Sequence, residues 1–167
     1  AWPINSADIV VNTDGKIYQL EATSIQSPLD RNAIPVLSGD MVPDKTQGLS
    51  ICSGDQIIKK LSGELDSETI LFATDVDGLY TDNPHTNKQA ELILDISLSD
   101  LKDNKIEIGE SHNIDTTGGL KGKIEECELI FKENRQVNMI KIFNGLKPGN
   151  FGLVLKSKLV IGTNIKK

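Results

Sequence analysis

The 167-residue sequence contains only two cysteines and two histidines, the residues from which disulfide frameworks and zinc sites are built. Its two cysteines, Cys52 and Cys127, are far apart and match no metal-binding or redox spacing. We expect both to be buried thiols, as in proteins of a reducing cytoplasm. Its two histidines, His85 and His112, have no partner at metal-ligand spacing, and we expect them at the surface. No metal site made of the chain's own side chains is therefore predicted.

Long apolar runs and an excess of positive charge are also missing. No stretch approaches the roughly 18 to 20 apolar residues that span a bilayer, and the start does not resemble a signal peptide. The net charge of −6 argues against nucleic acid as a partner. With 38% hydrophobic and 25% charged residues, the composition is that of a globular domain. We therefore expect a cytoplasmic protein with no membrane or nucleic-acid partner, in which any phosphate ligand is held locally by backbone amides and a few cations.

Short apolar runs that alternate with helix signals predict an α/β fold with a mostly parallel sheet. The pair Asp14–Gly15 between two strand-like runs predicts a hairpin, and Ser53 with Gln56 predicts a capped helix. Further strands are expected at TILFATD, ELILDIS, VNMIKIF and near the end of the chain, and helices at LSDLKDN, after TTGG and in the tail. The segment MVPDKTQG, residues 41–48, is expected to be a boundary or a mobile loop.

Two aspartates follow the apolar run TILFAT. Open α/β sheets bind ligands beyond the carboxyl ends of their strands, so Asp75 and Asp77 stand where a ligand is expected. The alternative is that Asp75 caps a turn and Asp77 belongs to an ordinary bend. Tyr80 either stacks on a flat ring or covers the core.

The stretch DTTGGLKGK, residues 115–123, has the chemistry of a phosphate site. Glycines at a helix start let backbone N–H groups approach a phosphate, and the helix dipole adds partial positive charge. Lys123 lies one turn into this helix, and its side chain leans back toward the helix start. The pattern is not a Walker loop, and Gly118 and Gly119 also suit a plain tight turn with solvated lysines nearby.

Two Ser-Gly-Asp triplets, residues 38–40 and 53–55, flank the segment 41–48. Each places a glycine where the backbone can meet an anion, and Gly54 and Asp55 lie at a helix start. On spacing alone, Asp55 is equally an acidic residue that interacts favourably with the helix dipole.

In this order the motifs resemble those of the amino acid kinase superfamily, and most closely its isopentenyl phosphate kinase branch. The resemblance covers residues 34–165 and rests on IPVLSGDMV, GLSICSGDQI, LFATDVDGLYTDNP, DTTGGLKGK, NG and GTNI. It implies an open three-layer αβα sandwich, and transfer of the γ-phosphoryl group of ATP, with Mg²⁺, to isopentenyl phosphate in isoprenoid biosynthesis by the mevalonate route. Residues 1–45 would end an acceptor-binding part and residues 46–167 would form the nucleotide-binding part. A small-molecule phosphate acceptor and a homodimer are also implied.

The resemblance also implies functional roles for individual residues of this sequence. Asp75, Tyr80 and Asp82 would line the nucleotide site, and Gly119 and Lys123 would hold the nucleotide phosphates. In the same way, Gly54 would offer its backbone to the acceptor, and Asp55 would be the catalytic aspartate that orients the lysines.

The family's glycine-rich loop, catalytic lysines and phosphate-gripping histidine have no counterpart in residues 1–33, so the chain is expected to be an N-terminally incomplete fragment. Other acceptors within the superfamily, as in fosfomycin kinase or uridylate kinase, remain alternatives. So do a non-catalytic nucleotide-binding module and a haloacid dehalogenase-type phosphatase, in which Asp75 would be the nucleophile and Asp77 the acid or base.

Overall fold

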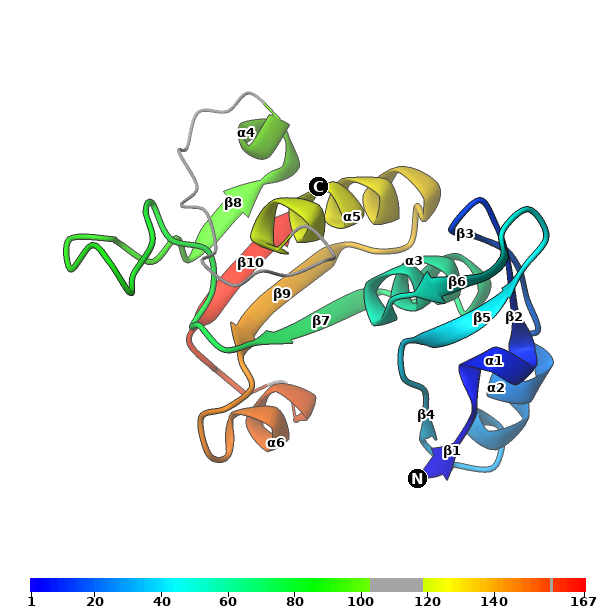
Figure 1. Ribbon diagram of the computed structural model, residues 1–167. Coiled ribbons are helices and arrows are strands. Elements are labelled where there is room, and N and C mark those ends of the chain that lie inside the picture. The colour runs from blue at the N-terminus through cyan, green and yellow to red at the C-terminus, as the bar shows by residue number, and fades with distance from the viewer. Residues whose placement is uncertain (103–118, 157) are drawn as a thin grey trace. The chain divides into compact units, whose positions relative to one another are not determined.

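The computed structural model describes residues 1–102, 119–156 and 158–167 and divides the chain into two compact units (Figure 1). Unit 1 is Ala1–Asp66 and unit 2 is Ser67–Lys167. The boundary expected between residues 45 and 46 falls inside unit 1, in the turn of a hairpin. The assignment of one part to the acceptor and the other to the nucleotide stays a prediction.

Unit 1 is built on a four-stranded sheet with the order β3-β2-β5-β6, beside a two-stranded parallel sheet of β1 and β4. Its elements are β1 (Trp2–Pro3), α1 (Ser6–Ile9), β2 (Val10–Thr13), β3 (Lys16–Leu20), α2 (Thr23–Leu29), β4 (Pro35–Val36), β5 (Asp40–Asp44), β6 (Gly48–Cys52) and α3 (Gly54–Glu64). Ile57 and Leu61 of α3 pack into a core with Val10, Val42 and Cys52.

The predicted hairpin and the predicted capped helix are both confirmed in unit 1. Asp14 and Gly15 have positive φ values of 51° and 72° between the antiparallel strands β2 and β3, as a two-residue hairpin turn of type I′ requires. The Ser53 hydroxyl accepts from the Gln56 N–H, and the Gln56 side chain accepts from the Ser53 N–H, each at 3.2 Å. This reciprocal pair starts α3.

The prediction that residues 41–48 are a boundary or mobile loop is wrong, because they lie in the antiparallel β5–β6 hairpin. The turn is organised by the buried carboxylate of Asp44. It accepts hydrogen bonds of 2.8–3.2 Å from the N–H or hydroxyl groups of Asp14, Gly15, Thr46, Gln47 and Ser50. Burial raises the pKa of Asp44, but these hydrogen bonds outweigh burial and hold the pKa well below its ordinary value. The polar composition of residues 41–48 suggested a loop, because the sequence does not show that the Asp44 carboxylate accepts hydrogen bonds from residues on both sides of the turn.

The helices α1 and α2 were not expected from the sequence. At the start of α2 the carboxylate of Glu21 accepts hydrogen bonds from the N–H groups of Thr23 and Ser24, both 2.9 Å, and from the Ser24 hydroxyl. These bonds, above all the one from the Ser24 hydroxyl, lower the pKa of Glu21 to about 2. Short helices of this kind depend on local caps more than on an apolar period.

Unit 2 is built on a second four-stranded sheet, with the order β7-β9-β10-β8. Its elements are β7 (Thr69–Thr74), β8 (Asp95–Ser97), α4 (Leu98–Lys102), α5 (Gly119–Glu133), β9 (Met139–Asn144), α6 (Asn150–Leu155) and β10 (Gly162–Lys166). Strands β7 and β9 are parallel, as are β8 and β10, whereas β9 and β10 are antiparallel. The predicted strands and helices of this half are therefore confirmed.

The two faces of the unit 2 sheet are covered by different helices, α5 on one face and α6 on the other (Figure 1). Cys127, Ile130 and Phe131 of α5 share a core with inward-facing residues of β7, β9 and β10. On the other face, Phe143 packs with Val154, and its ring lies 5.7 Å from that of Phe151, at 63° to it. This layering and the mostly parallel pairing confirm the predicted α/β sandwich.

Both cysteines are buried free thiols, as expected, and burial raises the pKa of Cys52. In the part of the chain that the structure describes, no helix is both long enough and apolar enough to cross a bilayer.

Candidate functional site

The carboxyl ends of β7 and β9 lie side by side in unit 2. The two strands pair in parallel from Thr69 with Met139 to Thr74 with Asn144, so both end at the same edge of the sheet. The Asn144 side chain donates a hydrogen bond of 3.1 Å to the backbone oxygen of Asp75. The N–H of Gly145 donates to the backbone oxygen of Thr74 at 2.9 Å. The loops that follow the two strands are thereby joined where an α/β sheet places its ligand.

The two aspartates of the β7 loop have different surroundings. Asp75 is exposed, and within the described residues its carboxylate has no hydrogen-bond partner. Asp77 is largely buried and forms an ion pair of 2.7 Å with the ammonium of Lys147, from the β9 loop. Asp75 is therefore the carboxylate of this loop that is open to a ligand, whereas Asp77 ties the two loops together. Lys147 was missed from the sequence, although its place three residues beyond a parallel neighbour of β7 was a usable signal.

The loop after Asp77 is pinned to β10. The Leu79 N–H donates to the Thr163 hydroxyl at 2.7 Å, and this hydroxyl donates to the Ile93 oxygen at 2.6 Å. Gly78 lies so close that a Cβ there would overlap the Thr163 hydroxyl and come within 2.9 Å of the Thr163 nitrogen. The path of the loop is thus fixed by a buried hydroxyl and by a glycine that cannot carry a side chain.

This path places Tyr80 in the electrostatic field of the Asp77–Lys147 pair. Tyr80 is half-buried. Its pKa is raised by burial and then by the negative charge of Asp77, while Lys147 lowers it. The phenol therefore stays neutral near pH 7 and is able to donate a hydrogen bond. Whether its ring stacks on a nucleotide stays a prediction.

Asp82 has a structural role in the same loop. Its carboxylate accepts hydrogen bonds of 2.7 Å from the side chain of Asn87 and from the N–H of Asn83. These bonds, first that of Asn87, lower the pKa of Asp82. Its oxygens thus hold a local turn, and the nucleotide role implied by the resemblance stays a prediction. His85, in this turn, is exposed as expected, while His112 lies outside the described residues.

The helix that carries Gly119 and Lys123 packs on the unit 2 sheet. Gly119 is the first residue of α5 in the described part of the chain, as expected, and Lys123 lies one turn further on. The side chain of Lys123 and the residue Gly118 lie outside the described residues. Cys127, Ile130 and Phe131 anchor the helix on the sheet.

Gly54 and Asp55 are the first two residues of α3 and belong to unit 1. The two Ser-Gly-Asp triplets meet there, because a Cβ on Gly39 would lie 2.9 Å from the Cys52 oxygen and 3.2 Å from the Gly54 nitrogen. Gly39 is thus required by close packing. By contrast, a Cβ on Gly54 would meet nothing within 4 Å, so packing does not explain this glycine. An approaching ligand is one explanation, and the substrate role of Gly54 and the catalytic role of Asp55 remain predictions.

Within the described residues, no three His, Cys, Asp or Glu side chains gather into a group that could hold a metal ion. Mg²⁺ does not require such a group, because it is commonly held by one or two carboxylates together with substrate phosphates. The exposed carboxylate of Asp75 fits that requirement.

Comparison with known proteins shows the family of this chain. The family model described as "Amino acid kinase family" matches residues 1–142, which include the whole of β7 with the loop that follows it, and β9 as far as Ile142. The chain belongs to the amino acid kinase family. Within this family, Asp75 and Asp77 are not the nucleophile and acid of a dehalogenase-type phosphatase, and the Asp77–Lys147 pair gives Asp77 another role.

Several relatives of the chain are isopentenyl phosphate kinases. That of Methanothermobacter thermautotrophicus is 37% identical over 155 residues, which cover 90% of this chain and 55% of the relative. That of Methanocaldococcus jannaschii is 34% identical over 151 residues, or 87% of this chain and 55% of the relative. Crystal structures of isopentenyl phosphate kinase include one that is 30% identical with a TM-score of 0.77, covering 98% of this chain and 58% of that chain. The chain thus spans about half of the length of the curated relatives it matches.

Proposed function

We propose that this chain is part of an ATP-dependent kinase that phosphorylates isopentenyl phosphate to isopentenyl diphosphate in isoprenoid biosynthesis. The observation that carries the proposal is the shared edge of β7 and β9, where the exposed Asp75 and the Asn144 side chain meet. This edge is the ligand-binding edge of an α/β sheet. The family match and the similarity to isopentenyl phosphate kinases support the choice of reaction.

The nucleotide would lie against the loops of unit 2. Asp75 and the neutral phenol of Tyr80 would face it, with Asp82 further along the same loop. The N–H of Gly119 and the ammonium of Lys123 would hold its phosphates at the start of α5, as helix starts hold anions elsewhere. Asp75 would help to hold Mg²⁺, and the ion would supply neutralisation of phosphate charge.

The acceptor would be held by unit 1, at the start of α3. A Cβ on Gly54 would meet nothing within 4 Å, so there is space beside this residue for an acceptor, and the capping box fixes the direction of the first helical turn. Asp55, beside it, is the candidate for orienting cationic side chains around the transferred group. Phosphoryl transfer needs positioning and charge neutralisation more than covalent assistance, so these elements suit that chemistry.

We further propose a small-molecule phosphate as the acceptor, a homodimer as the assembly and the cytoplasm as the location. The first two rest on the resemblance, and the third rests on the two buried free thiols, which are typical of reducing compartments.

Phosphorus NMR tests the proposal, with any polypeptide that precedes Ala1 in the natural protein restored. The protein is mixed with Mg²⁺-ATP and, in parallel samples, isopentenyl phosphate, uridine monophosphate, fosfomycin or no acceptor. We expect a new diphosphate together with ADP in the isopentenyl phosphate sample alone. Turnover of another acceptor would reassign the substrate, inorganic phosphate alone would indicate hydrolysis, and nucleotide binding without turnover would indicate a non-catalytic module.

A further inference from the structure

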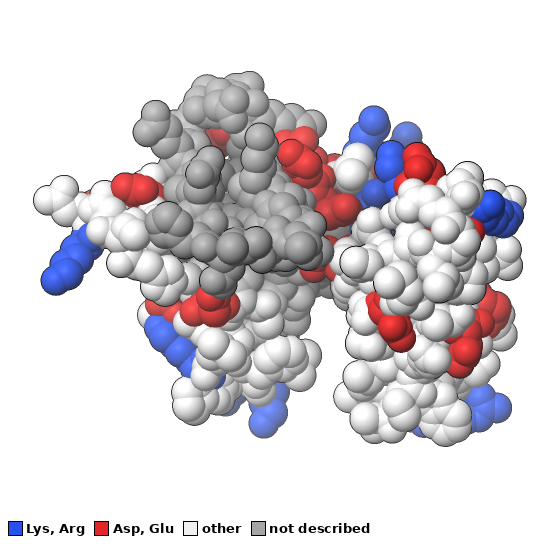
Figure 2. Space-filling model, in the orientation of Figure 1, with Lys and Arg blue, Asp and Glu red and all other residues white. Residues whose placement is uncertain are grey.

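The charges of the chain are unevenly distributed along the sequence. Residues 134–167 contain seven lysines and arginines and no aspartate or glutamate, whereas all 24 acidic residues lie in residues 1–133. A chain with net charge −6 therefore ends in a segment of charge +7. In Figure 2, blue side chains lie among white ones in the part of unit 2 where Figure 1 shows α6. Such asymmetry points to an anionic partner for this segment.

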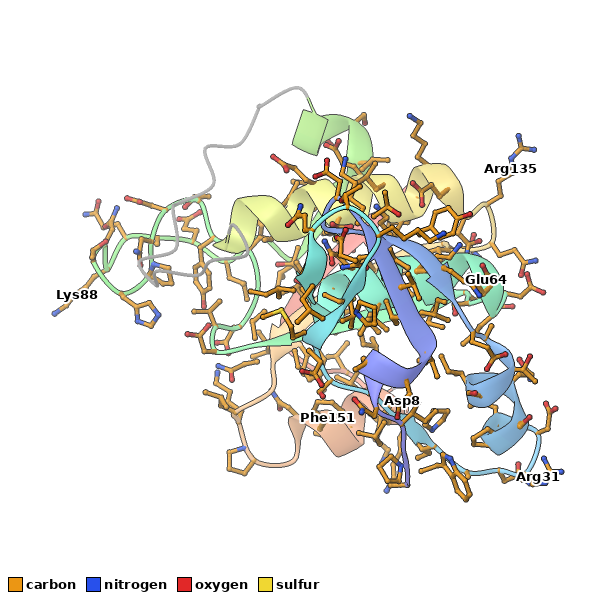
Figure 3. All side chains as sticks on the ribbon, turned by 45° about the vertical axis from the view of Figure 1, so that its right-hand side comes forward. Asp8, Arg31, Glu64, Lys88, Arg135 and Phe151 are labelled. Atoms are coloured by element: carbon orange, nitrogen blue, oxygen red, sulfur yellow. The ribbon has the colours of Figure 1, made fainter. Side chains whose placement is uncertain are left out.

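The same segment exposes large apolar side chains. Around α6, the exposed fraction is 65% for Leu155, 101% for Leu159 and 61% for Ile161. Phe151, labelled on α6 in Figure 3, is 54% exposed although its ring contacts Phe143. Exposed apolar clusters on a soluble domain commonly mark binding surfaces.

A groove of about 410 Å³ opens on this side of the unit 2 sheet. Its apolar wall includes Leu71, Val154, Leu155 and Leu159. Two of its lining residues, Thr69 and Met139, begin β7 and β9, so the groove lies at the opposite end of these strands from Asp75 and Asn144. The groove is therefore separate from the proposed nucleotide site, and its volume is in the range of small-molecule sites.

Two lysines line the groove, and within the described residues neither of them forms a direct ion pair with a carboxylate. Lys141 is half-buried and donates a hydrogen bond of 3.0 Å to the Asn164 side-chain oxygen. The other end of the Asn164 side chain reaches Asp95 at 3.3 Å, but Asp95 pairs with Lys166 at 2.7 Å. Lys158 is exposed at the groove. Burial lowers the pKa of Lys141, and the negative charge of Asp95 raises it by less. Among the described residues that line the groove, two are lysines and none is acidic.

We propose that this groove binds an amphiphilic anion, whose hydrocarbon chain lies along Leu71, Val154 and Leu155 and whose phosphate-type head faces Lys141 and Lys158. Two ammonium groups match a dianionic phosphate monoester better than a monoanionic head. An apolar wall beside them selects a hydrocarbon chain over a bare phosphate. The inference stands on these residues alone and does not depend on the proposed kinase function.

Methyl NMR of the full chain tests the proposal with n-octyl phosphate below its micellar concentration as the probe. We expect shifts confined to the methyl groups of Leu71, Val154, Leu155 and Leu159, and none with inorganic phosphate or octyltrimethylammonium. Shifts scattered over both units, or equal binding of octyltrimethylammonium, would overturn the proposal.

Two lysine variants and a matched control separate a charge effect from a folding effect. Lys158→Gln, at an exposed position, and Lys141→Gln should each weaken octyl phosphate binding about tenfold, as expected for losing one charge-assisted contact. Lys132→Gln, at the exposed end of α5 on the other sheet face, should leave binding unchanged. Equal affinities for Lys158→Gln and Lys132→Gln would overturn the assignment of the head group.

The natural source of the ligand is either a free phosphorylated hydrocarbon or a lipid headgroup, and vesicles distinguish them. Co-sedimentation with phosphatidylcholine vesicles that contain phosphatidic acid, competed by octyl phosphate, would identify a membrane lipid. Octyl phosphate binding without co-sedimentation would identify a free metabolite.

Discussion

Asp44 in unit 1 and Asp75 in unit 2 both lie at the carboxyl end of a β-strand, but their carboxylates have opposite surroundings. Asp44 is 5% exposed and its carboxylate accepts hydrogen bonds from five residues. Asp75 is exposed, and among the residues that the structure describes only its backbone oxygen accepts a hydrogen bond, from Asn144. A carboxylate whose lone pairs are already filled stabilises its own loop, whereas one with free capacity is available to a ligand.

The largest effect is expected on the rate of phosphoryl transfer, from a substitution of Lys123 in the proposed phosphate site. Lys123→Ala should slow phosphoryl transfer by roughly 10² to 10³ in the natural full-length protein, the usual loss for one charge-stabilising donor. Lys132→Ala, on the same helix, should leave the rate unchanged. Rate measurements at saturating ATP check this, and a change below about threefold would remove Lys123 from the phosphate site.

Asp44→Asn should destabilise unit 1 strongly, because an amide cannot accept all the hydrogen bonds that the carboxylate accepts. The folded pKa lies below the unfolded value of about 3.9, so the contribution of Asp44 is complete above that pH and is lost as the pH falls through the folded pKa. Wild-type unit 1 should therefore become less stable progressively below about pH 4. Asp44→Asn should show a shallower pH dependence, which comes from other carboxylates such as Glu21, whose pKa is lowered to about 2. Thermal melts across this range measure both. Asp14→Asn, in the same turn, serves as the control, and an equal loss there would contradict the role of Asp44.

Gly78→Ala should destabilise unit 2 by about 1 to 3 kcal/mol, the usual cost of forcing atoms into a packed site. Its Cβ would overlap the Thr163 hydroxyl that holds the loop. Denaturant unfolding measures the loss. Gly152→Ala, where a Cβ would meet nothing within 4 Å, is the matched control. Similar stability of the two variants would show that the loop does not depend on this contact.

Asp75→Asn, unlike Asp44→Asn, should leave the stability of its unit nearly unchanged and should weaken the binding of a ligand. Its free energy of unfolding should stay within about 0.5 kcal/mol of wild type, as for most surface substitutions. Its affinity for Mg²⁺-ATP should fall about tenfold, since one charged ligand contact is lost. Calorimetric titration and a thermal melt on the same sample test both halves. Unchanged ATP affinity would return Asp75 to a role in capping the turn.

The smallest effect is expected at the ion pair between the two loops of unit 2. Lys147 is 52% exposed in its side chain, so its pair with Asp77 should contribute less than about 1 kcal/mol. Lys147→Met should therefore change the free energy of unfolding little, with a loss that shrinks in high salt. A loss above about 2 kcal/mol would mean that the ion pair stabilises unit 2 as strongly as the Asp44 hydrogen bonds stabilise unit 1.

The sequence predicted those features that have a local cause. The Asp14–Gly15 turn, the Ser53–Gln56 cap and the continuous apolar run of β7 each carry their signal within a few residues. What it missed depends on partners far along the chain. Asp44 and its donor Asp14 are 30 positions apart, and Asp77 and Lys147 are 70 apart. Position at a strand end predicted a ligand at both Asp75 and Asp77, and the structure shows that Asp75 is exposed whereas Asp77 pairs with Lys147. The hydrogen bonds of Asp82 within its turn were not predicted.

An amide NMR titration with Mg²⁺-ATP shows whether the edge formed by β7 and β9 binds a nucleotide. We predict shifts of the backbone amides of Asp75, Tyr80, Gly119 and Gly145, all in unit 2. In the same titration, the amides around Asp44 should not move. No shifts at millimolar ATP, or shifts that avoid the ends of β7 and β9, would contradict this prediction.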